Sequence, residues 1–128
     1  MLDHITFSVA DILRAKAFYD AALKPLGYRV VYEVTPQQSG GAHFMGYGDD
    51  RKPYFWIAAG DGLNGRFHVA FVAKDRAAVD AFYRAALAAG GKDNGPPGLR
   101  PHYHANYYGA FVLDPEGHNM EAVCHLAE

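Results

Sequence analysis

The sequence predicts an α+β protein made of two βαβββ modules. A stretch that begins HITFSVAD (residues 4–27) is followed 64 positions later by a similar stretch that begins HVAFVAKD (residues 68–91). Such self-similarity at a fixed offset indicates a repeated structural unit. Each copy also passes from a strand-like pattern to a helical one, and strand-like segments follow it. The identical pairs include His4/His68, Phe7/Phe71, Asp11/Asp75, Phe18/Phe82, Tyr19/Tyr83, Leu23/Leu87 and Gly27/Gly91.

The two repeated segments each predict one strand and one helix. β-branched and aromatic residues in residues 4–10 favour extended chain, and Asp11 and Asp75 are suitable N-cap residues for the helices that follow. Apolar residues then recur at helical spacing, and glycine ends each helix. The whole chain, 1–128, is expected to be one domain, with module one at about residues 1–60 and module two at about 65–128.

Three further strands complete each predicted module. In module one they are residues 28–34, 42–48 and 54–59; in module two, a weaker segment near 91–93, then 107–114 and 119–124. The tetrapeptide DPEG (residues 114–117) suits a type I turn between the last two strands. That turn pairs Leu113 with His118 and places Ala110 opposite Glu121. The loop at residues 94–106 is long enough to be functional.

Alternation along the strands separates an apolar face from an open face that the helices leave uncovered. Ile5, Phe7 and Val9 form the apolar set of the first strand, so His4 and Thr6 belong to the open face. The same parity puts His68 and Glu121 on the open face of module two. Two imidazoles and one carboxylate can hold a divalent metal ion and leave positions vacant for a substrate. Iron, manganese, zinc, nickel and cobalt ions all suit this set, and the ligands alone do not choose among them.

The segments DHITFSVAD, FHVAFVAKD, the AFY helices and DPEGHNMEAV together resemble the vicinal oxygen chelate superfamily, whose members include glyoxalase, bleomycin resistance and extradiol dioxygenase proteins. The resemblance covers the whole chain. It implies paired modules that form a cup-shaped mixed sheet with the helices on the outside. It further implies that His4, His68 and Glu121 are the metal ligands, and that Glu121 is the catalytic residue.

One position departs from the glyoxalase I pattern. The 64-residue offset matches Glu121 with Ile57, where glyoxalase I-type isomerases place a fourth metal ligand, and isoleucine cannot coordinate a metal. Fosfomycin-resistance enzymes and extradiol dioxygenases, which use three ligands at the matching places, resemble the chain better in this respect. Small relatives often form dimers, and in several the site takes ligands from both chains.

Further side chains are candidates for a substrate pocket. Strand alternation places several apolar residues of module one on the open face and Trp56 on the helix-covered face. The other candidates are two histidines of the loop at residues 94–106 and one tyrosine of the strand that follows it. The candidates are Thr6, Phe44, Phe55, Ile57, His102, His104 and Tyr108.

Charge, hydropathy and cysteine content limit the classes of binding partner and the cellular location that we expect. The net charge of −2 gives no basic surface for nucleic acid, and no apolar run is long enough to cross a membrane. Cys124 is the only cysteine, which excludes an internal disulfide, and the N-terminal residues lack the pattern of a signal peptide. We therefore expect a cytoplasmic homodimer that binds a small molecule.

Two functions remain open from the sequence. The first is a glyoxalase-like, metal-dependent enzyme of lyase, isomerase or dioxygenase type that acts on a small oxygen-chelating substrate. The second is a metal-free protein of bleomycin-resistance type that binds a drug-like molecule, for which the aromatic residues of the open face are suited.

Overall fold

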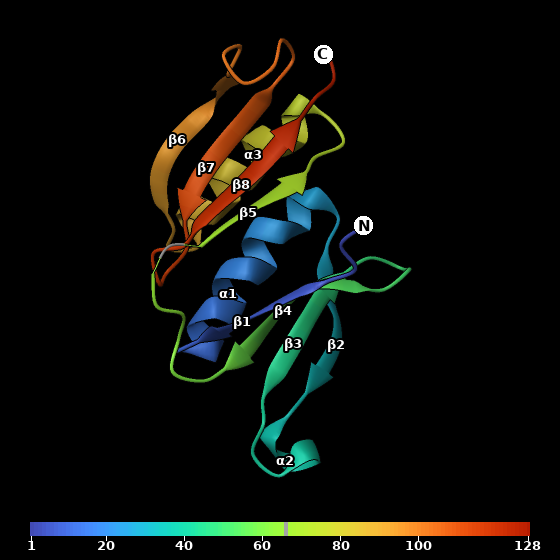
Figure 1. Cartoon of the computed structure of the whole chain (residues 1–128), viewed down its shortest axis with the longest axis vertical. Helices are drawn as coiled ribbons and strands as arrows, with labels where there is room; N and C mark the ends of the chain where they lie inside the picture. Colours follow the sequence, from blue (N-terminus) through green and yellow to red (C-terminus); the bar gives the residue numbers. More distant parts are fainter. Residues whose placement is uncertain (66) are drawn as a thin grey trace.

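The computed structural model describes residues 1–65 and 67–128, and confirms the α+β class and the two modules (Figure 1). Module one contains, in chain order, β1 (Ile5–Val9), α1 (Ile12–Leu23), the 3-10 turn η1 (Lys24–Leu26), β2 (Arg29–Val34), α2 (Pro36–Ser39), β3 (Phe44–Gly48) and β4 (Pro53–Ala59). Module two contains β5 (His68–Val72), α3 (Arg76–Ala88), β6 (Lys92–Leu99), β7 (Tyr108–Leu113) and β8 (Asn119–Cys124).

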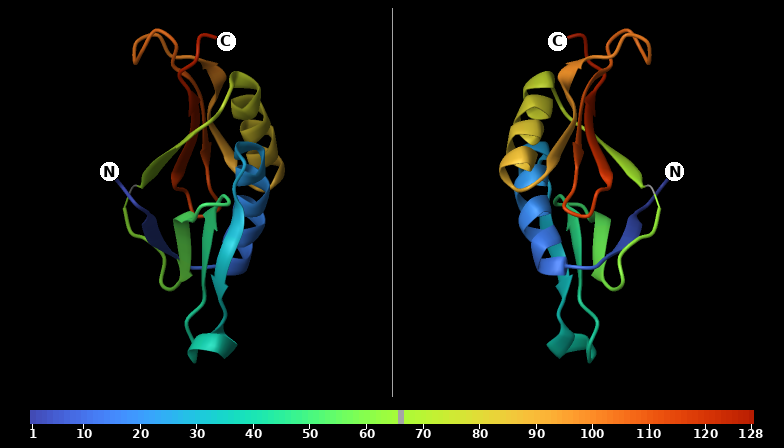
Figure 2. Two further views of the ribbon diagram at one scale, coloured as in Figure 1. Left: turned by 90° about the vertical axis from the view of Figure 1, so that its right-hand side faces the viewer. Right: turned by 90° about the vertical axis from the view of Figure 1, so that its left-hand side faces the viewer.

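Each module forms its own four-stranded mixed sheet. The strand orders are β1-β4-β3-β2 and β5-β8-β7-β6, so the two sheets have the same topology. In each, the first strand lies parallel to the last, and the remaining pairs are antiparallel. Figure 2 shows α1 and α3 on the same side of the molecule, where they pack against each other. None of the helices among the described residues has the length and apolar character of a membrane span.

The caps of the two main helices follow the sequence pattern. The carboxylate of Asp11 accepts a hydrogen bond from the amide of Arg14, and that of Asp75 from the amide of Ala78. Each satisfies an amide that the first helical turn leaves without an intrahelical partner. Gly27, with φ of +86°, ends η1 in the left-handed conformation, which glycine adopts without steric cost.

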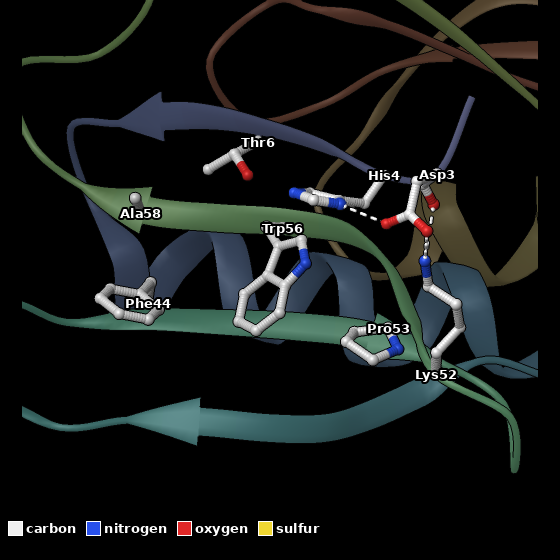
Figure 3. A pocket seen from close by; sticks show the side chains of 8 residues that line it. All are labelled: Asp3, His4, Thr6, Phe44, Lys52, Pro53, Trp56 and Ala58. Carbon is white, nitrogen blue, oxygen red and sulfur yellow. Dashed lines mark hydrogen bonds and ion pairs between the residues drawn. The ribbon is translucent and has the colours of Figure 1, made fainter. Parts of the chain in front are cut away.

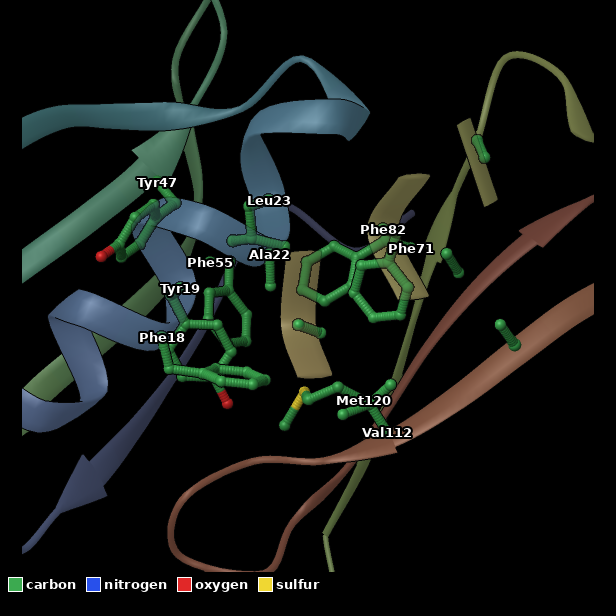
Figure 4. Close-up of a cluster of buried hydrophobic side chains, with 14 of the residues drawn as sticks. Phe18, Tyr19, Ala22, Leu23, Tyr47, Phe55, Phe71, Phe82, Val112 and Met120 are labelled. Atoms are coloured by element: carbon green, nitrogen blue, oxygen red, sulfur yellow. The ribbon is translucent and has the colours of Figure 1, made fainter. Parts of the chain in front are cut away.

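A single apolar core joins the two modules (Figure 4). Aromatic rings cross the boundary between them: Phe55 of β4 lies 5.1 Å from Phe71 of β5, and Phe7 of β1 lies 4.8 Å from Phe67. Since these rings are on the helix-covered faces of both sheets, the modules share a core through those faces. The open faces of the two sheets are therefore left outside this core.

The turn between β7 and β8 fastens module two to the first helix. The Glu116 carboxylate accepts hydrogen bonds from the amides of Ala10 and Asp11, just before α1, where a negative charge is favourable. The hydroxyl of Tyr19 in α1 donates to Asp114 at 2.5 Å. These contacts hold the two modules in one fixed arrangement.

The same turn corrects the predicted pairing of β7 with β8. The amide of Asp114 donates to the carbonyl of His118, and Gly117 has φ of +89°. The hairpin therefore closes around three residues with a left-handed glycine, one residue more than a two-residue turn. Leu113 consequently pairs with Asn119 rather than His118, and Phe111 rather than Ala110 lies opposite Glu121.

The predicted long loop is also shorter than expected. β6 extends from Lys92 to Leu99 and includes Pro96 and Pro97. It is the edge strand of its sheet, where proline is tolerated, and its pairing with β7 is irregular. The connection to β7 is therefore confined to residues 100–107.

Candidate functional site

The open face of module two carries a buried carboxylate paired with an imidazole. Glu121 in β8 is 2% exposed, and its Oε1 lies 3.1 Å from Nε2 of His68 in β5. The register of the two parallel strands places Glu121 beside Ala70, two residues from His68 on the same face. The pair brings together two of the three predicted ligands.

Tyr107, which was not among the residues predicted for the site, contacts the other oxygen of Glu121. The hydroxyl of Tyr107 donates a hydrogen bond to Oε2 of Glu121, the oxygen that does not face His68. Burial, and then this bond to the carboxylate, raises the pKa of Tyr107 above its ordinary value of 10, so that the phenol stays protonated. A Cβ at Gly109 would lie 3.2 Å from Oε2, so glycine there, and not Ala110, leaves room for the carboxylate.

A hydrogen bond at one nitrogen and a stacked aromatic ring orient the imidazole of His68. Its Nδ1 lies 3.0 Å from the carbonyl oxygen of Asn119, an acceptor that requires the proton on Nδ1. Its face stacks on Phe111 with 6.2 Å between ring centroids and 12° between planes, and the Arg100 guanidinium lies 5.4 Å from the Phe111 ring centroid. Nε2 of the ring therefore faces the Glu121 carboxylate.

His4 has the equivalent arrangement in module one. Its Nδ1 lies 2.6 Å from Oδ1 of Asp3, whose other oxygen forms an ion pair with Lys52 (Figure 3). These two partners, Lys52 first, lower the pKa of the Asp3 carboxyl, which keeps it ionised. In both modules the imidazole thus has an oxygen atom beside Nδ1 and turns Nε2 away from it, as histidines that bind metal ions through Nε2 commonly do.

The third predicted ligand lies elsewhere in the same chain. Among residues 1–65 and 67–128, no three histidine, cysteine, aspartate or glutamate side chains come close enough to hold one ion. His4 belongs to module one, and its side chain is 52% exposed, whereas His68 and Glu121 belong to module two. One chain therefore brings His68 and Glu121 together and leaves His4 apart from them.

Beside His4, the open face of module one forms a concave surface of about 470 Å³, which we call the aromatic hollow (Figure 3). Asp3 and Lys52 lie at its rim. Its other lining residues are His4, Thr6, Phe44, Pro53, Trp56 and Ala58. Two of the residues predicted for a substrate pocket, Thr6 and Phe44, thus line this hollow.

The side chains of β4 lie on the opposite faces of the sheet from those predicted. The pairing of β4 with β1 sets Trp56 beside Thr6 on the open face, whereas Phe55 and Ile57 are buried in the core, at 2% and 0% exposed. Three consecutive apolar residues give no alternation from which to choose a face. An alignment of the two modules at a constant offset of 64 residues is wrong at this strand, because module two has one residue more between its first and last strands. Trp56, not Ile57, therefore occupies the position of module one that corresponds to Glu121.

The remaining pocket candidates lie apart from the aromatic hollow. Tyr108 faces the helix side, where its hydroxyl donates to Asp80 of α3 at 2.7 Å, because the turn shifts the register by one residue. His102 and His104 are exposed in the loop before β7. Their rings lie against Tyr103 and His125, and both of those rings lie within 5.2 Å of Tyr107, measured between centroids.

Comparison with known proteins gives one family. Residues 1–122 match the family described as Glyoxalase/Bleomycin resistance protein/Dioxygenase superfamily. A glyoxalase/bleomycin resistance protein from Albidiferax ferrireducens T118 has a similar structure, with a TM-score of 0.68 and 28% identity over 95% of this chain and 96% of that chain. No curated protein matches the sequence.

Two more distant structures share the fold. A glyoxalase I mutant from Zea mays has a TM-score of 0.70 and 24% identity, over 95% of this chain and 46% of that chain. A mutant of the fosfomycin resistance protein FosX from Listeria monocytogenes, crystallised with Mn(II) and a dihydroxypropylphosphonic acid, has a TM-score of 0.70 and 21% identity, over 100% of this chain and 92% of that chain.

Proposed function

The chain belongs to the Glyoxalase/Bleomycin resistance protein/Dioxygenase superfamily, and on that premise we propose that it is an enzyme that uses a divalent metal ion to act on a small substrate through neighbouring oxygen atoms. The observation that carries the proposal is the shared orientation of the two histidines. Both have Nδ1 hydrogen-bonded to oxygen, and Nε2 of His68 lies 3.1 Å from a buried carboxylate oxygen.

The donor set fits a divalent first-row metal. Two neutral imidazoles and one carboxylate suit Fe(II), Mn(II), Zn(II), Ni(II) or Co(II), and they leave coordination positions vacant. Such an ion, when bound, supplies Lewis acidity toward substrate oxygen atoms. Glu121 would contribute Oε1 as a ligand and serve as the base in proton transfer, while Tyr107 holds Oε2 and fixes the orientation of the carboxylate.

In this proposal the site is shared between two copies of the chain. The helix faces of both modules are occupied by the common core, so the modules of one chain do not close over their own open faces. Exposed apolar side chains lie on both open faces: Tyr32 beside Trp56 is 58% exposed, and Val72, on the same strand as His68, is 65% exposed. A second copy would cover them and bring His4 of one protomer to His68 and Glu121 of its partner.

Metal content after purification without chelator tests the proposal. We expect a bound first-row metal that is lost in His68→Ala and Glu121→Ala. His43→Ala is the matched control, because His43 also contacts a carboxylate, that of Glu33 at 3.0 Å, but on β2. Native protein that binds no metal, even after incubation with each of the five ions, contradicts the enzyme.

A metal-free binding protein is the second candidate function. The observation that favours it is the aromatic hollow, whose lining is mostly apolar and whose volume is in the range of small-molecule sites. Absence of metal together with tight binding of an aromatic compound would support this candidate over the enzyme.

A further inference from the structure

The floor of the aromatic hollow is one flat indole. Trp56 lies between Thr6 of β1 and Gly46 of β3, its cross-strand neighbours. A Cβ built at Gly46 would come within 2.9 Å of two atoms of the indole ring, so the ring lies directly on the glycine backbone. With that side against the sheet, the other side of the indole faces the hollow (Figure 3).

Neighbouring aromatic rings hold the indole in this position. Phe44 meets it edge-on, with 5.9 Å between centroids and 62° between planes, and Tyr32 lies at 5.8 Å. Both distances are in the range of favourable aromatic pairs. Trp56 is therefore a supported surface with a fixed orientation, which a planar ligand can contact without first ordering it.

The polar groups of the hollow gather along one rim. His4 directly precedes β1 and Thr6 lies in it, and Asp3 and Lys52 form an ion pair at the rim. Figure 3 shows the His4 ring with one nitrogen bonded to Asp3 and the other turned away from that contact. A ligand that lies on Trp56 would thus have its polar end near His4 and its apolar end near Phe44 and Ala58.

We propose that Trp56 is a stacking platform for an aromatic or heteroaromatic ring of the substrate, whose oxygen atoms extend toward His4. The inference rests on the proposed function only for the role of those oxygen atoms. The ring preference follows from the indole itself, because an aromatic ring gains a stacking interaction that a saturated ring of similar size does not. Trp56 would then determine specificity, at the position where module two carries Glu121.

Two acids that differ only in the ring test the inference. Mandelate and hexahydromandelate carry the same α-hydroxycarboxylate, but only mandelate has a planar ring. Trp56 is the only tryptophan of the chain, so its fluorescence reports contact directly. We expect mandelate to quench this emission and to bind roughly fivefold to tenfold more tightly than its saturated analogue in calorimetric titrations of the native protein.

Variants separate stacking from general apolar contact. In Trp56→Leu the preference for mandelate should disappear, whereas Tyr103→Leu, an exposed aromatic in the loop before β7, should retain it. If Trp56→Leu does not fold, Gly46→Ala provides a second variant, because its methyl group displaces the indole and should reduce the preference. Equal binding of the two acids, failure of both to bind, or a preference that survives Trp56→Leu overturns the inference.

The experiments distinguish a failure of the stacking inference from a failure of the proposed metal-dependent function. Metal bound in the native protein with equal affinity for the two acids would refute the platform and leave the proposed enzyme standing. A mandelate preference in protein that binds no metal would support the platform and refute the metal-dependent function.

Discussion

Nε2 of His68 and Oε1 of Glu121 lie 3.1 Å apart across two parallel strands, and the other nitrogen and the other oxygen of the pair are both already bonded. The carbonyl of Asn119 accepts from the imidazole, and Tyr107 donates to the carboxylate. Nε2 and Oε1 therefore face each other from side chains that are held in place, and we propose that a divalent cation binds between them.

Removal of the Tyr107 hydroxyl should weaken metal binding without emptying the site. In Tyr107→Phe the carboxylate of Glu121 keeps its place but loses the donor to Oε2. Loss of such an outer-shell partner typically costs between tenfold and a hundredfold in affinity, and we expect about tenfold. Calorimetric titration with Mn(II) measures it, and Tyr103→Phe is the control. An unchanged dissociation constant would show that Tyr107 does not support Glu121.

Asp3 should have the same role for His4. Asp3→Ala removes the acceptor on Nδ1, so the imidazole is free to rotate and to change tautomer, and metal affinity should fall about tenfold. Lys52→Met removes the ion pair and a hydrogen bond to the Asp3 carbonyl but keeps the Asp3 carboxylate, so its effect should be smaller. The same titration compares the two variants. Equal losses would assign the effect to the charge of the rim rather than to the orientation of His4.

Gly46 should be needed for the position of Trp56. In Gly46→Ala the new methyl group would lie within 2.9 Å of Pro53 and the indole, so the ring must move off the strand. Overpacking of this kind costs about 1–3 kcal/mol of unfolding free energy. We expect that loss in urea unfolding, together with a red shift of the tryptophan emission as the indole meets water. Native emission with native stability would place the indole elsewhere.

The free energy of unfolding should fall at alkaline pH because the phenol of Tyr47 is buried. Burial, and then the Asp20 carboxylate, raises the pKa of Tyr47 above its ordinary value of 10. The unfolded chain therefore loses this proton at lower pH than the folded chain. The stabilising contribution is complete below pH 10 and declines as pH rises above it. Urea unfolding at about pH 8 and about pH 11 should show a smaller decline for Tyr47→Phe than for the native protein, and equal declines would exclude Tyr47 as a source.

Much of the fold could be predicted because its signals are local. Caps at Asp11 and Asp75, helical spacing after each, and the repeat itself are sufficient for two βαβββ modules. Errors arose where one residue changes the register. The left-handed Gly117 lengthens the β7–β8 turn, which turned Tyr108 to the helix side, and the extra residue of module two reversed the faces of Trp56 and Ile57.

The faces on which the three proposed ligands lie could be predicted from the sequence, but the residues that contact them could not. Strand alternation places His4, His68 and Glu121 on open faces, as the structure does. Asp3 adjoins His4 in the sequence, yet adjacency gives no sign of a hydrogen bond. Tyr107 differs from the predicted Tyr108 by one position, and only the observed register separates them. The modules of one chain pack through the shared aromatic core of Phe7, Phe55 and Phe71, and the proposal of a site shared by two chains rests on that packing, which the sequence did not give.

Complementation between two inactive variants tests the shared site most directly. A heterodimer of His4→Ala with His68→Ala pairs the intact His4 of one protomer with the intact His68 and Glu121 of its partner. The account predicts that each variant alone binds no metal, and that the purified heterodimer binds one ion per dimer. A heterodimer that binds none, or a monomeric native protein that binds one ion per chain, would contradict it.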